Sequence, residues 1–440
     1  MIQTGYAERK SISYLPRIPL QGDFFLTYRC NNNCRHCWNR VADCEKISRN
    51  ELSLEQIKTI VSQARKNGAQ EWSLSGGEPL LRGDFLDIFM YIKENSAACA
   101  LNTNGTLITK KIAPFLRGSG PKSISLYGAT AKTHDYITRR PGSFEETIRG
   151  ARYLQEAKVH FIMQIILLKD NQHELKSMIA LAESSSRGYR NGNSWLYLSA
   201  CGNPEVNRGI ISQRIAPELS APIDAFDEFY FENKNHPGNC KRNLFYFSGC
   251  TKGNYFFINP YGELSFCCFI QRKDMFYNLK KGSFAVGWDK FIPALSKKIK
   301  VTQEYLKNCG SCNMRIHCRW CPAYAFLEHR RFGAKIDYLC AVTREKLTLK
   351  EDELSKHRLF ELRNIIKEFL NLYLKLSLHP KKSEYFPVNR GIDFLGYLVF
   401  KDYILLRKLT VKRYIKKLKR ILKKLDKQDL LKELGKSFLA

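Results

Sequence analysis

Short apolar runs alternate with amphipathic stretches along the first half of this 440-residue chain, and this alternation constrains the fold more than any other feature. The runs are rich in β-branched and aromatic residues, as is typical of buried strands, whereas the stretches between them have apolar residues at helical spacing. Repeated strand–helix units favour a parallel sheet with its chemistry at the carboxyl ends of the strands. We expect strands at residues 24–28, 71–75, 98–104, 122–128, 160–168 and 194–199.

Two helices of this region carry start signals in the sequence. Ser53 precedes an amphipathic stretch that ends at Gly68, which are the positions of a helix N-cap and a helix end. Ser143 is followed three residues later by Glu146, the spacing of a capping box. The sequence therefore predicts an α/β fold: a partial (β/α)6 barrel, then a cysteine-rich irregular domain and a basic helical tail. We place these three domains at residues 20–210, 211–345 and 346–440.

The composition indicates a cytoplasmic protein. Hydrophobic residues make up 44% of the chain and charged residues 26%, and no apolar run approaches the ~20 residues that cross a bilayer, so no membrane partner is expected. The first residues lack the apolar core of a secretory signal. Fifteen cysteines need an explanation in a reducing compartment, where disulfides are rare. Binding of a metal or an iron–sulfur cluster is the natural one.

Three cysteines follow the first expected strand in the pattern C-x3-C-x2-C. They are Cys30, Cys34 and Cys37. A structural zinc site normally has four protein ligands, and 4Fe–4S clusters are usually held by four cysteines, so three thiolates suggest an iron with one open coordination position. The alternative is a zinc site with His36 or Cys44 as the fourth ligand.

The three-cysteine spacing resembles the signature of radical S-adenosylmethionine (SAM) enzymes, in which the open iron of a 4Fe–4S cluster binds SAM. The motif S-G-G-E-P at residues 75–79 follows the second expected strand and matches a second motif of that family. The resemblance implies that Gly76, Gly77 and Glu78 contact the ammonium of SAM. Glu78 has an alternative role as a first-turn helix residue.

The ends of the third, fourth and fifth strands supply further SAM candidates. The resemblance implies that Ser125 meets the ribose and that Asn104 contacts SAM, although Ser125 could also be a bonded strand hydroxyl. An arginine of the pair Arg139 and Arg140 could face the SAM carboxylate. Asn171 could approach the adenosine or cap a loop.

Seven more cysteines lie downstream as C-x11-G-x4-C, C-x2-C-x5-C-x2-C and a final cysteine. This order resembles the SPASM arrangement of auxiliary 4Fe–4S clusters, except that the family usually has three residues in the last spacing. Two zinc ribbons are the alternative. The resemblance implies one or two auxiliary clusters, the distal one on Cys309, Cys312, Cys318 and Cys340 and the proximal one on Cys250, Cys267 and Cys321, with Cys240 as a further candidate. We interpret the remaining cysteines as ordinary thiols, with Cys268 able to replace Cys267: these are Cys44, Cys99, Cys201 and Cys268.

The resemblance also implies a function. Radical SAM enzymes cleave SAM reductively to a 5′-deoxyadenosyl radical, which abstracts hydrogen from a substrate, while the protein supplies orientation and shielding. Members with a SPASM domain often modify peptides or proteins. We therefore expect a peptide or protein substrate and an electron donor such as flavodoxin or ferredoxin. The sequence assigns no catalytic residue.

The carboxyl-terminal segment is strongly basic. Residues 401–440 contain 14 Lys or Arg against 4 Asp or Glu, within a chain of net charge +30. Residues 373–425 resemble the palm end and thumb of bacterial reverse transcriptases of the group II intron, retron and diversity-generating types, but the catalytic Tyr-x-Asp-Asp motif is missing. Nucleic acid is a possible partner of such a segment. Two alternatives follow: a nucleic-acid-binding accessory protein of a retroelement with structural metal sites, and a radical SAM enzyme that modifies RNA.

Overall fold

The computed structural model describes most of the first 349 residues and three short strands of the tail. The chain forms two compact units, Met1–Asn364 and Ile365–Ala440. The candidates Cys44, Cys201 and Cys240 and most of residues 373–425 lie outside the described residues. The described ranges are 17–39, 51–186, 188–191, 195–200, 202–230, 244–270, 272–349, 392–394, 397–399 and 404–406.

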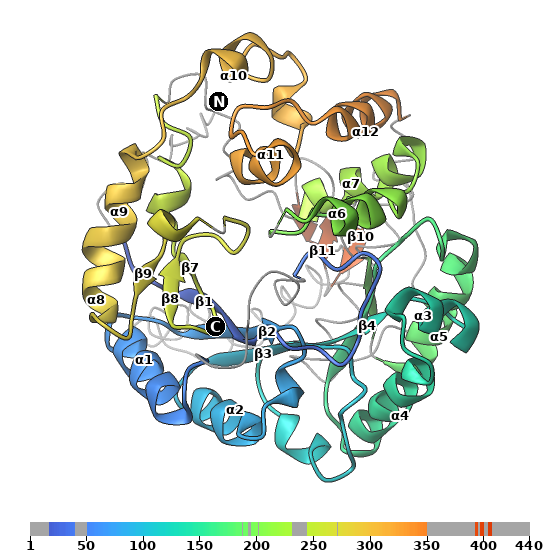
Figure 1. The fold of residues 1–440 in the computed structure, drawn as a ribbon. Coiled ribbons are helices and arrows are strands. Elements are labelled where there is room, and N and C mark those ends of the chain that lie inside the picture. Colours follow the sequence, from blue (N-terminus) through green and yellow to red (C-terminus); the bar gives the residue numbers. More distant parts are fainter. Residues whose placement is uncertain are drawn as a thin grey trace, which may run out of the picture. The chain divides into compact units, whose positions relative to one another are not determined.

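A nine-stranded sheet organises the first unit (Figure 1), in the order β6-β5-β4-β3-β2-β1-β7-β8-β9. The first six strands pair in parallel with their neighbours in the sequence, so the predicted α/β partial barrel is confirmed. These strands are β1 (Gln21–Thr27), β2 (Glu71–Gly76), β3 (Ala98–Thr103), β4 (Lys122–Leu126), β5 (Phe161–Ile165) and β6 (Tyr189–Asn191).

Helices cover the outer face of this sheet (Figure 1) and bury their apolar sides against it. The first helix begins as the sequence predicts: Ser53 accepts a hydrogen bond from the Gln56 amide, and the Gln56 side chain accepts one from the Ser53 amide. Such caps stabilise a helix by ~1 kcal/mol. The helices are α1 (Leu54–Lys66), η3 (Pro79–Leu81), α2 (Phe85–Glu94), η4 (Ala113–Leu116), α3 (Ala131–Thr138), α4 (Ser143–Glu156), η5 (Gln172–Glu174) and α5 (Leu175–Ser185).

The start of α4 differs from the prediction of a capping box. Its N-cap is Gly142, with φ of 82°. The Ser143 hydroxyl instead bonds Asp135 of α3 at 2.9 Å, and the Glu146 carboxylate pairs with Arg140 at 2.6 Å. Asp135 also accepts the Phe144 amide at 2.8 Å, so α4 is capped from the preceding helix. The capping-box prediction was wrong because a side chain outside the motif satisfies the helix end.

The sixth strand also lies elsewhere than predicted. It is β6 (Tyr189–Asn191), which pairs with β5, whereas residues 195–200 form no strand. In that segment Trp195 packs into the large hydrophobic core, while Leu196 and Leu198 pack into a second cluster. The prediction at residues 194–199 was wrong because this segment is apolar for another reason. It is buried between two core clusters and does not pair with a sheet.

The cysteine-rich region continues the same sheet. Strand β7 (Tyr255–Ile258) pairs in parallel with β1, in register from Gln21 with Tyr255 to Phe24 with Ile258. An antiparallel turn at Gly262, with φ of 81°, then leads to β8 (Glu263–Ser265) and β9 (Tyr277–Asn278).

Mostly short helices make up the rest of the unit. Among the described residues, no helix is both long and apolar enough to cross a membrane. The helices are α6 (Pro204–Ser212), α7 (Pro217–Tyr230), η7 (Cys250–Lys252), η8 (Lys273–Met275), α8 (Phe284–Val286), η9 (Gly287–Phe291), α9 (Ile292–Ala294), η10 (Leu295–Lys297), α10 (Gln303–Lys307), η11 (Arg315–His317), α11 (Pro322–His329) and α12 (Asp337–Thr348).

The second unit contains a small antiparallel sheet. Its strands are β10 (Ile392–Phe394), β11 (Tyr397–Val399) and β12 (Ile404–Leu406), in that order. The prediction of a helical tail did not include this sheet.

Candidate active site

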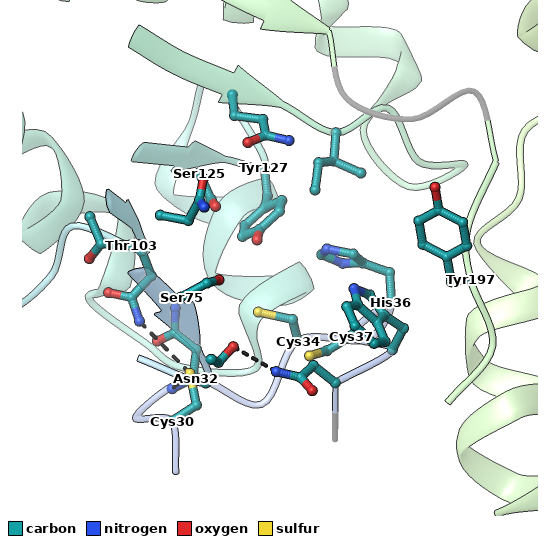
Figure 2. A pocket seen from close by; sticks show the side chains of 18 of the residues that line it. Cys30, Asn32, Cys34, His36, Cys37, Ser75, Thr103, Ser125, Tyr127 and Tyr197 are labelled. Carbon is teal, nitrogen blue, oxygen red and sulfur yellow. Dashed lines mark hydrogen bonds between the residues drawn. The ribbon is translucent and has the colours of Figure 1, made fainter. Parts of the chain in front are cut away.

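A cavity of about 420 Å³ opens at the carboxyl ends of β1 to β5 (Figure 2). Cys30, Cys34 and Cys37 all line it. Ser75 of β2 and Ser125 of β4 line it from the strands. The fold thus brings the predicted cysteine loop to the end of a parallel sheet where ligands bind.

The cysteine loop is fixed by the end of α3. The Asn33 amide donates to the Thr138 carbonyl and the Arg35 amide to the Ile137 carbonyl, each at 2.9 Å. These carbonyls belong to the last turn of α3, where the helix itself leaves acceptors unused. Arg35 also pairs with Asp170 at 3.4 Å. The loop is therefore held in place by backbone bonds that do not involve the thiols.

The three thiols share the cavity with His36. His36, the zinc ligand of the alternative hypothesis, packs its ring edge-on against Tyr127 with centroids 4.7 Å apart. Burial lowers the pKa of His36 to about 4. Three thiols around one open cavity suit a larger group such as a 4Fe–4S cluster.

The two glycines of the S-G-G-E-P motif let β2 approach the chain that leads to Cys30. The Gly77 amide donates to the Thr27 carbonyl at 2.7 Å. A Cβ at Gly76, where φ is 137°, would lie 2.2 Å from the Thr27 oxygen, and a Cβ at Gly77 would lie 2.2 Å from the Arg29 oxygen. Only glycine fits this contact. Both glycines line the cavity, where the sequence predicts SAM.

Glu78 is not among the described residues that line the cavity. Its fully buried carboxylate accepts hydrogen bonds from the Thr103 hydroxyl and the Asn104 amide, both at 2.8 Å, and from the Leu80 amide at 3.1 Å. It is the N-cap of η3, in agreement with the alternative interpretation of a helix-start residue. Burial raises the pKa of Glu78 to about 7. Its position shows that it holds the end of β3, including Asn104, against β2.

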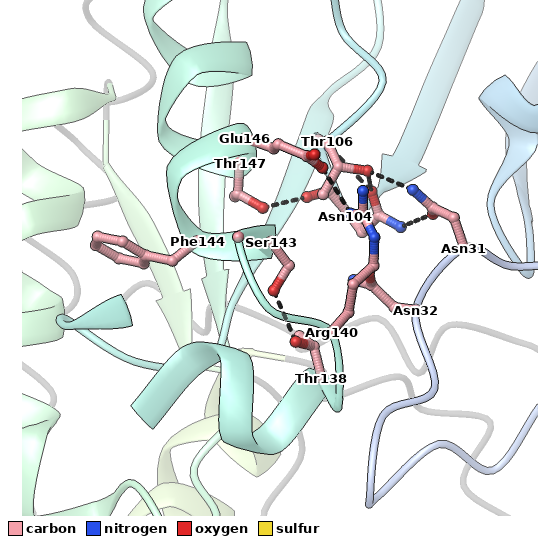
Figure 3. A network of polar contacts seen from close by, with 12 residues as sticks. Asn31, Asn32, Asn104, Thr106, Thr138, Arg140, Ser143, Phe144, Glu146 and Thr147 are labelled. Carbon is pink, nitrogen blue, oxygen red and sulfur yellow. Dashed lines mark hydrogen bonds and ion pairs between the residues drawn. The ribbon is translucent and has the colours of Figure 1, made fainter. Parts of the chain in front are cut away.

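Asn104 and Ser125 both lie at the cavity. The Asn104 side chain donates to Asn31 of the cysteine loop at 2.8 Å and accepts from the Thr106 hydroxyl at 2.7 Å (Figure 3). Ser125 lies opposite Gln164 in the pairing of β4 with β5, and both line the cavity. A polar wall therefore extends across β2 to β5.

The weaker SAM candidates have other roles. Asn171 is fully buried and caps a loop: it accepts the Leu168 amide at 2.7 Å and donates to the Tyr127 carbonyl at 3.0 Å. Arg140 pairs with Glu146 near the start of α4 (Figure 3). Neither arginine of the Arg139–Arg140 pair is among the described residues that line the cavity.

Sequence reasoning missed several cavity residues. Asn32, inside the cysteine motif, is buried, and neither polar atom of its side chain has a hydrogen-bond partner among the described residues. Because unpartnered buried amides are rare, this one indicates a ligand in the cavity. Its position in the sequence between Cys30 and Cys34 could have identified it as a cavity residue. Gln164, Trp38 and Tyr197 carried no motif that could have identified them.

The four predicted distal cysteines come together in the second array. Cys309, Cys312, Cys318 and Cys340 line one small cavity of about 20 Å³, although Cys340 comes from α12 and the others precede α11. Burial, with the Cys340 and Cys318 thiols close by, raises the pKa of Cys309 to about 12. Thiols in such a place ionise readily only with a bound cation.

The predicted proximal cysteines are placed in part. Burial raises the pKa of the Cys267 thiol most strongly, and the neighbouring thiols of Cys268 and Cys321 raise it further. Cys267, Cys268 and Cys321 are therefore close together. Cys250 begins η7.

Comparison with known proteins agrees with this geometry. Residues 24–182 match the radical SAM superfamily. The AdoMet-dependent heme synthase of Methanosarcina barkeri is 28% identical over 71% of this chain and 92% of its own length. The mycofactocin maturase MftC of Mycolicibacterium smegmatis is 31% identical over 36% of this chain and 40% of its own.

Two solved structures share the fold. Streptococcus suis SuiB bound to SAM has a TM-score of 0.54 at 16% identity and covers 74% of this chain and 75% of its own. The enzyme anSMEcpe, with bound AdoMet and the Cp18Cys peptide, has a TM-score of 0.54 at 17% identity and covers 78% and 99%.

The fold and the site define an iron–sulfur enzyme with a partial parallel barrel and a cysteine loop at its mouth. Residues 24–182 belong to the radical SAM superfamily, and the chain is an enzyme whose cofactors are a 4Fe–4S cluster and SAM.

Proposed function

We propose that this enzyme abstracts hydrogen from a peptide or protein, at a cavity where Cys30, Cys34 and Cys37 hold the SAM-cleaving cluster. The observation that carries the proposal is the meeting of these three thiols at one cavity with the polar ends of β2 to β5. The cluster and SAM, when bound, supply a 5′-deoxyadenosyl radical. The chain itself orients SAM and the substrate and excludes water.

The polar wall supplies the groups that SAM requires. We assign the backbone of Gly76 and Gly77 and the unpartnered Asn32 amide to the amino-acid part of SAM, and Ser125 to the ribose. Glu78 positions Asn104 and does not itself contact SAM. Its hydrogen bond to the Asn104 amide holds Asn104 beside the cysteine loop.

The second array suits auxiliary clusters. The shared cavity of Cys309, Cys312, Cys318 and Cys340 supports a distal cluster. The proximity of Cys267 and Cys321 supports a proximal one, with Cys250 as its third ligand. A flavodoxin or ferredoxin would supply the electrons.

The class of substrate rests on two kinds of relative. SuiB has been solved bound to its precursor peptide SuiA, and anSMEcpe with bound peptides, which favours a peptide or protein. A second candidate is a tetrapyrrole, because a relative named AdoMet-dependent heme synthase aligns over 92% of its length.

The mutation Cys34→Ala tests the cluster assignment. We expect the anaerobically reconstituted, reduced variant to form no 5′-deoxyadenosine from SAM, because the loop then has two thiols for the cluster. The measurement is 5′-deoxyadenosine by chromatography. Cys99→Ala, which removes a buried thiol of β3, is the matched control and should retain activity. Equal turnover by the Cys34 variant and the wild type would exclude the assignment.

A further inference from the structure

The cavity has two chemically different sides. Ser75, Asn104 and Ser125 line it with hydrogen-bonding groups, and Trp38 and Tyr197, whose ring centroids lie 6.2 Å apart, line it with aromatic rings. Figure 2 shows Tyr197 across the cavity from the serines, with the cysteine loop between them. Because SAM carries an ammonium, a carboxylate and a ribose, its hydrogen-bonding needs match the polar side.

The aromatic side continues beyond the cavity as a connected set of rings. Trp38 and Phe269 lie with ring centroids 4.9 Å apart, Tyr197 and Phe269 4.3 Å apart, and Tyr197 and Tyr324 5.0 Å apart. All four residues are partly buried, and Trp38 and Tyr197 line the cavity. We call Trp38, Tyr197, Phe269 and Tyr324 the aromatic wall.

The aromatic wall joins both cysteine arrays. Trp38 directly follows Cys37, and Phe269 and Tyr324 follow Cys267 and Cys321 by two and three residues. The Tyr324 hydroxyl donates to the Tyr197 hydroxyl at 3.3 Å. The Trp38 and Tyr197 rings that line the cavity are aromatic surfaces, which suit an apolar, flat partner.

We propose that the aromatic wall binds a flat aromatic group of the substrate, stacked against Trp38 and Tyr197, while SAM occupies the polar side. This inference rests on the proposed function, because it needs SAM on the polar side. It assigns Trp38 as a residue that determines substrate specificity. A tryptophan side chain of a peptide and a tetrapyrrole macrocycle share the required chemistry.

Equilibrium dialysis with the reconstituted, SAM-bound enzyme tests the proposal. The probes are a tetrapeptide with one tryptophan, the same tetrapeptide with leucine in its place, and coproporphyrin III. We expect one aromatic probe to bind, and the leucine peptide to bind at least several-fold more weakly. The aromatic probe that binds identifies the source of the ring.

Two variants on separate segments keep the test independent of folding at one site. Trp38→Leu and Tyr197→Leu should each weaken binding of the aromatic probe by about tenfold, and Trp38→Phe should restore most of it. Phe115→Leu, at an exposed position on η4, is the control and should bind as the wild type does. Iron content and cluster absorbance, measured on every variant, confirm that the clusters are present.

The outcomes separate the two proposals. If neither aromatic probe binds the wild type, or if both leucine variants bind like the control, the aromatic wall is not the substrate site. If the wild type forms no 5′-deoxyadenosine, the proposed function fails instead, whatever the probes do.

Discussion

The buried Lys122 side chain joins the start of β4 to the start of β3 and to the turn before β4. At the start of β4 its ammonium donates to the Gly120 carbonyl at 2.8 Å and to the Cys99 carbonyl at 3.1 Å, with the Ser119 and Gly118 carbonyls at 3.3 and 3.4 Å. The residue is 1% exposed. Burial lowers the pKa of Lys122 to about 8, so the folded chain releases this proton more readily than the unfolded chain does.

This lowered pKa predicts a pH dependence of stability. From about pH 8 to 10.5 the unfolded chain keeps the proton that the folded chain has lost, so Lys122 makes the free energy of unfolding rise by up to about 3 kcal/mol. Lys122→Met should lack this rise. The measurement is the difference in chemical unfolding between wild type and variant at several pH values, which cancels the groups that do not interact with Lys122. Lys110→Met, at an exposed lysine, should follow the wild type. A constant difference between wild type and the Lys122 variant would contradict the prediction.

At the scale of elements, the site depends on strand ends that nearly touch. The end of β2 lies against the chain after β1 because Gly76 and Gly77 have no side chain. This contact places the Gly76–Gly77 backbone and the cysteine loop at one cavity.

A methyl group at this contact should disrupt it. Gly77→Ala would bring a Cβ to 2.2 Å from the Arg29 carbonyl oxygen, and the backbone must move to relieve the clash. We expect a loss of stability of about 2 kcal/mol or more and weaker SAM binding. Thermal unfolding and retention of labelled SAM measure the two effects. Gly83→Ala is the control, since a Cβ there meets nothing within 4 Å. If Gly77→Ala and Gly83→Ala were equally stable, the contact of Gly77 with the Arg29 carbonyl would not contribute to stability.

The elements also show what sequence could and could not predict. The strands before β6 and the cap at Ser53 were predicted, because periodicity and cap signals are local. The start of α4 and the place of β6 were not, because Asp135 of the preceding helix decides the first and packing into two core clusters decides the second. The same holds for the site: the spacing of Cys30, Cys34 and Cys37 is local, whereas the inward position of Tyr197 and the buried bonds of Glu78 arise only in the fold.

At the scale of the whole molecule, two compact units divide the chain near residue 364. The radical SAM match lies in the first unit, and the basic residues of the tail lie in the second. The proposed SAM chemistry uses residues of the first unit. Binding of nucleic acid is the function that its charge favours.

Deletion of the second unit, Ile365–Ala440, tests this division of roles. We expect the truncated enzyme to form 5′-deoxyadenosine at close to the wild-type rate and to lose a gel shift with RNA or DNA. For the full chain, the shift should weaken steeply with rising salt, because lysine and arginine contacts to phosphates release counterions. If the truncated enzyme gave an unchanged gel shift, the second unit would not be the site of nucleic-acid binding.

The parallel pairing of β1 with β7 sets an order of events during translation. One edge of β1 stays unpaired until residues 255–258 have left the ribosome, long after the three-cysteine loop. At about 5–20 residues per second, this interval lasts on the order of ten seconds or more. In that interval the sheet of the nascent barrel ends at β1, and the residues that follow β1, with the three cysteines, lie next to this free edge.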